Sequence, residues 1–84
     1  MEIFYYAIVV YCLKICNTMN DMDKYINLNL MTHDECLVTL DKMVKQEKEL
    51  HPVLISRNIG VLCVKHDLMS DEDLEKYQVW GEAT

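Results

Sequence analysis

The sequence predicts an α+β fold: a three-stranded sheet in the order 2-1-3, with one long helix on one face and a short C-terminal helix, in the chain order ββαβα. Two strongly apolar runs, residues 3–13 and 59–64, favour strands, and a helical repeat of apolar residues lies between them. Eighty-four residues suffice for only one hydrophobic core, so residues 1–84 are expected to form a single domain.

The first apolar run is typical of a central strand. Its β-branched and aromatic residues favour a strand, and its length is well below the roughly 20 residues that a membrane-crossing helix needs. Glu2 before it and Lys14 near its end disfavour a cleaved signal peptide, so no membrane association is expected. Because both faces of the alternating pattern are apolar, this strand should lie between two others.

Residues 25–30 alternate Ile or Leu with Asn, which predicts an edge strand that pairs antiparallel with the first. Thr32 and Glu35 match a capping box that opens the long helix. The apolar residues of that helix recur at helical spacing: Cys36, Leu37, Leu40, Met43 and Val44. Pro52 cannot extend the helix, which should end near Leu50.

Residues 59–64 predict the third strand, in which Gly60 indicates a bulge or a close backbone approach. It should run parallel to the second strand, on the other side of the first, after a right-handed crossover. Ser70 and the acidic residues 71–73 predict the start of the short helix, with Tyr77, Val79 and Trp80 returning to the core.

Charge and motif content exclude several function classes. Fourteen acidic and eight basic residues give a net charge of −6, which repels nucleic-acid phosphates. The three histidines are scattered, with no nucleophile motif near them, so no enzymatic activity or catalytic residue is predicted. His33-x-x-Cys36 and Cys63-x-x-His66 approach zinc spacing, but strand residues three apart point to opposite faces and no Cys-x-x-Cys is present. We therefore expect no metal site and no cofactor.

The four cysteines leave two readings open. Cys36 opens the long helix and Cys63 lies in the strand over which that helix should pack, so a disulfide between them is geometrically reasonable. Alternatively, the cysteines are small buried hydrophobes of a reducing cytosol.

One long helix can cover only one face of the sheet, which leaves the other face for a contact surface. Aromatic side chains with a polar tip are enriched at interfaces. The residues expected to bind a protein partner or a second copy of the chain, as in a homodimer, are Tyr5, Val9, Tyr11, Leu13 and Trp80.

An apolar N-terminal strand, the T-x-x-E-C helix start at residues 32–36 and a late Cys-bearing strand at residues 60–66 resemble the small uncharacterised proteins of tailed bacteriophages. The resemblance implies a host-directed binder or a minor virion component and lends no site residues. The leading hypothesis is thus a small acidic, non-enzymatic phage protein that binds or inhibits a host protein in the host cytoplasm. The alternatives are a structural virion decoration or assembly protein and a disulfide-stabilised secreted or periplasmic domain.

Overall fold

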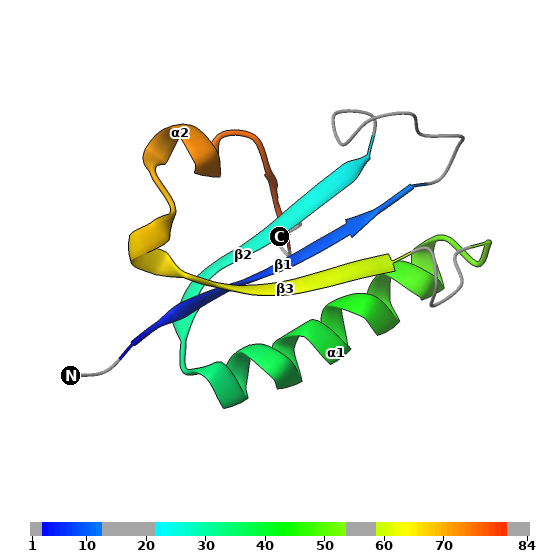
Figure 1. Cartoon of the computed structure of the whole chain (residues 1–84). Coiled ribbons are helices and arrows are strands. Elements are labelled where there is room, and N and C mark those ends of the chain that lie inside the picture. The colour runs from blue at the N-terminus through cyan, green and yellow to red at the C-terminus, as the bar shows by residue number, and fades with distance from the viewer. Residues whose placement is uncertain (1–2, 13–21, 54–58, 81–84) are drawn as a thin grey trace.

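The computed structural model describes residues 3–12, 22–53 and 59–80, which form one sheet with helices on both faces (Figure 1). The strand order is β3-β1-β2-β4. The strands are β1 (Tyr5–Tyr11), β2 (Asp23–Met31), β3 (Ile59–Lys65) and β4 (Gln78–Val79). The helices are α1 (His33–Leu50), α2 (Asp71–Leu74) and a 3-10 turn, His66–Leu68. The predicted α+β class with one long and one short helix is confirmed.

The sheet is built around β1, which pairs antiparallel with β2 on one side and with β3 on the other. Every residue from Ala7 to Tyr11 is buried. Strand alternation sends Ala7, Val9 and Tyr11 to one face, and Ile8 and Val10 to the other. The two-sided apolar pattern of this strand therefore reflects a layer on each side.

Helix α1 covers the Val9 face. Its N-cap is Thr32, whose hydroxyl accepts from the Glu35 amide while the Glu35 carboxylate accepts from the Thr32 amide, as a capping box requires. These hydrogen bonds hold the pKa of Glu35 below its usual value. The buried cluster under α1 comprises Ala7, Val9, Tyr11, Met31, Cys36, Leu40 and Met43.

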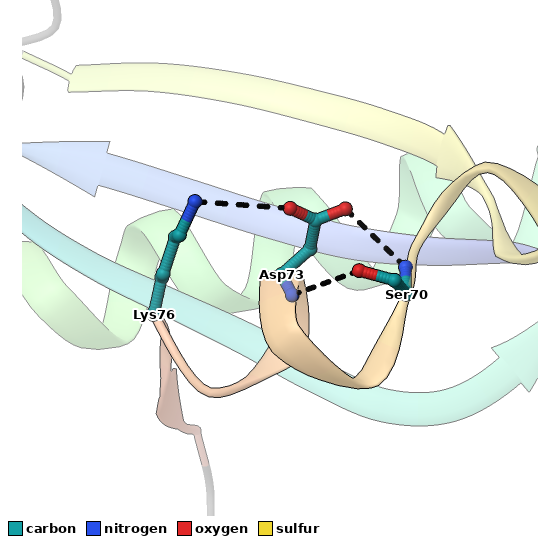
Figure 2. Close-up of polar contacts among 3 residues, drawn as sticks. All are labelled: Ser70, Asp73 and Lys76. Carbon is teal, nitrogen blue, oxygen red and sulfur yellow. Dashed lines mark hydrogen bonds and ion pairs between the residues drawn. The ribbon is translucent and has the colours of Figure 1, made fainter.

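The segment after β3 covers the opposite face. Ser70 caps α2 in a second capping box with Asp73, which also lies 3.9 Å from the exposed Lys76 ammonium (Figure 2). Although α2 is short, its capping fixes the direction in which Leu74 and the following Tyr77 reach the sheet. The cluster on this face consists of Ile8, Val10 and Ile26 with Met22, Met69, Leu74 and Tyr77 against them.

Two features of the predicted sheet are wrong. The sheet has four strands rather than three, because the chain after α2 extends and pairs parallel with β2, Tyr25 opposite Gln78 and Ile26 opposite Val79. Consequently β2 is an interior strand and not an edge. The short helix itself covers only Asp71–Leu74.

The far end of β2 is irregular. Ala7 pairs with Asn27 but Tyr5 pairs with Met31, so residues 28–30 all lie opposite Tyr6. Such a bulge bends a strand and interrupts its packing. Of the alternating apolar residues predicted to share one covered face, only Ile26 is buried, while Leu28 and Leu30 are exposed.

Candidate functional site

The residues predicted to form an exposed docking face lie mainly in the interior. Val9 and Tyr11 are completely buried beneath α1. Tyr5 and Trp80 are half-buried on the same face, and Leu13 lies outside the described residues. Val9 and Tyr11 are therefore not exposed as expected, because α1 packs on their face of the sheet, and the chain around α2 covers much of the other face.

Tyr11 and Trp80 instead bind one buried carboxylate. Glu47 of α1 is 4% exposed, and it accepts hydrogen bonds from the Tyr11 hydroxyl at 2.9 Å and from the Trp80 indole N–H at 3.0 Å. The Tyr11 ring also stacks on Tyr25, with centroids 5.6 Å apart. Both carboxylate oxygens have donors, so Glu47 joins α1 to β1 and to Trp80, which follows β4. The cluster is a structural network rather than an open site.

Ionisation of Tyr11 should destabilise the fold at alkaline pH. Burial, followed by the interactions with Tyr25 and Glu47, raises the pKa of Tyr11 well above its ordinary value of about 10. The folded state therefore holds this proton more tightly than the unfolded state. The contribution of Tyr11 to the free energy of unfolding is complete below the pKa that its phenol has in the unfolded state. As the pH rises above that pKa, the free energy of unfolding falls by up to about 1.4 kcal/mol per pH unit.

Urea unfolding above pH 10 should test this expectation, comparing wild type with Tyr11→Phe. The variant has no phenol to ionise at this position, so its free energy of unfolding should fall less steeply with pH than that of wild type. Equal slopes for the two proteins would contradict the assignment to Tyr11.

The cysteines hold α1 against the sheet. Cys36, in the first turns of α1, forms a disulfide with Cys63 of β3, with Cα atoms 6.2 Å apart, which is the pair named from the sequence. Cys12 is disulfide-bonded as well. Cys36 and Cys63, the cysteines of the two spacings that approach those of zinc sites, are therefore bonded to each other. Among the described residues, no group of three His, Cys, Asp or Glu side chains is placed to hold a metal ion.

The outer edge of β3 is the open feature of the described sheet. His66 donates its amide to the Phe4 carbonyl at 3.0 Å. In an antiparallel ladder, residues that bond to the partner alternate with residues whose N–H and C=O point away. With Tyr5 opposite Lys65, the outward-pointing groups are those of Ile59, Val61, Cys63 and Lys65. No strand within the described ranges pairs with them.

Apolar side chains flank this edge on both faces of the sheet. Val61 is 45% exposed and lines a shallow groove with Leu37, Leu40, Asp41 and Val44 of α1. Leu37 is 51% exposed in this groove. Leu62 is 50% exposed on the opposite face. An edge strand normally avoids association through charges, prolines or bulges, and β3 has only Lys65 at its end. We define the β3 edge site as the outward-pointing N–H and C=O groups of β3 together with the side chains of Leu37, Val61 and Leu62.

The sequence predicts the β3 strand but does not mark it as a site. Its signal was present: an uncharged, β-branched run without proline is typical of strands that pair with other chains. The exposure of Leu37 could not be read from helical spacing, because that spacing groups it with the buried Cys36 and Leu40.

Comparison with protein-family models, with curated proteins and with solved structures finds no match to this chain. Within the described ranges, no helix is both long and apolar enough to cross a membrane. The geometry of the chain itself therefore carries the functional argument.

Proposed function

We propose that this protein is a small, non-enzymatic protein-interaction module that binds an extended segment of a partner along β3. The observation that carries the proposal is that, within the described sheet, the outer edge of β3 pairs with no strand and is flanked by exposed apolar side chains. Strand addition to an open edge supplies main-chain hydrogen bonds for affinity, while flanking apolar side chains supply specificity.

The geometry of β3 suits this role. Val61 and Cys63 present outward N–H and C=O groups, and the groove beside Val61 can receive every second side chain of an added strand. Leu62 contacts the alternate side chains on the other face. The disulfide between Cys36 and Cys63 fixes β3 to α1, so the edge is presented by a rigid element and little ordering is needed on binding.

The class of partner follows from charge and composition. A net charge of −6 disfavours nucleic acid, and the strand itself offers an uncharged apolar edge. The resemblance to small phage proteins suggests a host protein as the partner, which the module would bind and inhibit in the host cytoplasm. Strand addition would equally serve the second candidate, a virion decoration protein whose sheet extends that of a neighbour.

The disulfide favours a third candidate. Disulfides persist in oxidising compartments and are rare in the cytosol. Cys36 to Cys63, together with the bonded Cys12, is typical of a small secreted or periplasmic domain. A secreted or periplasmic domain would use the same β3 edge site to bind a protein outside the cytoplasm.

Selection from a displayed library of random peptides, against the immobilised full chain with its disulfides intact, should test the proposed function. We expect enriched peptides to be apolar and extended. Val61→Pro removes an outward N–H without removing a hydrogen bond to β1, and it should weaken peptide binding by about tenfold or more. Isothermal titration of individual peptides measures the change.

Val38→Lys is the matched control, because Val38 is an exposed apolar residue on another side of α1, beside Thr39 and Lys42. It should leave peptide affinity unchanged. Peptides that bind the Val61→Pro protein as tightly as wild type, with both proteins folded by circular dichroism, would refute the β3 edge as the binding site.

A further inference from the structure

We infer that the partner strand at the β3 edge site is β3 of a second copy of this chain. The inference deepens the proposed function and rests on it. Two copies would pair β3 antiparallel about a two-fold axis through Leu62, giving one continuous sheet in the order β4-β2-β1-β3-β3-β1-β2-β4.

The register follows from the strand itself. Leu62 is the middle residue of Ile59–Lys65, so symmetry about Leu62 pairs the whole strand with its copy. Val61 then lies opposite Cys63 of the second copy, and both have outward N–H and C=O groups, as a hydrogen-bonded pair requires. Leu62 faces its own counterpart in a non-hydrogen-bonded pair, where side chains approach more closely.

The strand is also complementary to itself in side-chain chemistry. Cross-strand pairing sets Leu62 against Leu62, Gly60 against Val64 and Val61 against Cys63. Apolar and β-branched cross-strand pairs of this kind stabilise sheets. Lys65 meets Ile59 at each end of the seam, so no two like charges of β3 lie directly opposite one another.

The local charge of β3 permits pairing with a copy of this chain, and the interface must offset the long-range repulsion between two copies that each carry a net charge of −6. β3 itself contains no carboxylate that would select a basic strand, and Asp41 is the acidic residue that lines the adjoining groove. On the groove side, Asp41 is paired with Lys45 at 3.2 Å, which locally neutralises its charge. The acidic residues of α2, Asp71 to Asp73, belong to the segment on the other face of the sheet, where Leu74 and Tyr77 make the contacts with the strands. Figure 1 shows α2 on the side of the sheet opposite α1.

The two-fold axis also brings the α1 grooves together. In an antiparallel pair, residues directly opposite each other point to the same face, so both copies of α1 would lie on one side of the extended sheet. The exposed Leu37 and the groove residues Leu40 and Val44 would then line a common seam with the two Val61 side chains. This adds apolar burial beyond the strand pairing, as an isologous interface needs.

Sedimentation velocity over a wide concentration series tests the inference with the full disulfide-bonded chain. We expect a reversible dimer, and we expect Leu62→Lys and Leu62→Glu each to weaken it by about tenfold or more, because like charges then face one another across the axis. An equimolar mixture of the two variants should recover dimer formation, because Lys then faces Glu. Val38→Lys should dimerise as wild type does.

Hydrogen exchange gives a second readout. The amides of Val61 and Cys63 should become protected as the wild-type concentration rises, and those in Leu62→Lys should not. A wild-type protein that stays monomeric yet binds edge-dependent peptides would overturn the self-pairing and leave the proposed function standing. A monomer that also fails to bind such peptides overturns both. A dimer that survives both Leu62 variants, or that leaves these amides unprotected, overturns the β3 seam.

Discussion

Glu47→Ala is expected to lower the free energy of unfolding by about 3 kcal/mol or more. The substitution removes the acceptor of two donors, the Tyr11 hydroxyl and the Trp80 indole N–H. Tyr11 is completely buried, so water cannot replace the lost partner without opening the core. No buried side-chain N or O atom among the described residues otherwise lacks a hydrogen-bond partner, so the variant would create a defect that the fold does not contain.

Glu47→Gln separates the hydrogen bonds from the volume of the side chain. The amide oxygen can accept from the Trp80 N–H, whereas the NH₂ can only donate to the Tyr11 oxygen and leaves the Tyr11 O–H without this acceptor. This variant should therefore lose less than Glu47→Ala does, about 1 to 2 kcal/mol. Glu49→Ala, at an exposed position of the same helix, is the control and should lie within about 0.5 kcal/mol of wild type. Urea unfolding measures all three. Equal stability of Glu47→Ala and Glu49→Ala would show that the network contributes nothing.

Local sequence signals were sufficient for most of the fold. The two-sided apolar run predicted β1 at the centre, and the antiparallel neighbours β2 and β3 follow from it. The capping residues Thr32 and Ser70 marked both helix starts, because a side-chain oxygen satisfies free amides only at those positions. Pro52 correctly placed the end of α1 near Leu50.

The errors share one cause, which is tertiary contact between distant segments. Trp80 is drawn to the sheet by its amide, which donates to the Ile26 carbonyl at 2.9 Å, and by its indole, which donates to Glu47. These long-range bonds accompany the pairing of β4 with β2, which no local sequence pattern indicates. The covered face was also misassigned: both faces of β1 are apolar, so alternation alone cannot decide which one α1 selects.

The candidate site was missed for a related reason. β3 is an edge strand with the apolar composition of a central strand, so its composition does not show that it lies at the end of the sheet. The composition of β3 suggests that Leu62 and Val64 are core residues, yet Leu62 is half exposed because, among the strands that the structure describes, β1 alone pairs with β3. The aromatic residues that suggested an interface, Tyr11 above all, act inside the protein as hydrogen-bond donors to Glu47.

The second large effect is expected from the disulfide between Cys36 and Cys63. Their sequence separation of 27 means that the bond closes a long loop, and the chain-entropy model assigns such a loop about 3.5 kcal/mol of stabilisation. The double variant Cys36→Ala/Cys63→Ala should therefore unfold at a clearly lower urea concentration than wild type. Replacing both residues avoids a single thiol that could exchange with the Cys12 disulfide.

The same variant links stability to function. Because Cys63 is in β3 and Cys36 is in α1, the bond holds the edge strand against the helix that lines its groove. Loss of the bond should weaken peptide binding or dimerisation as well as stability, since β3 would have to be ordered on association. Dithiothreitol, which reduces disulfides, should lower the urea concentration at which half of the wild-type protein is unfolded. The double variant lacks the Cys36–Cys63 bond, so the effect of dithiothreitol on it measures the contribution of the Cys12 disulfide. A double variant with the wild-type midpoint would show that packing alone holds β3 in place.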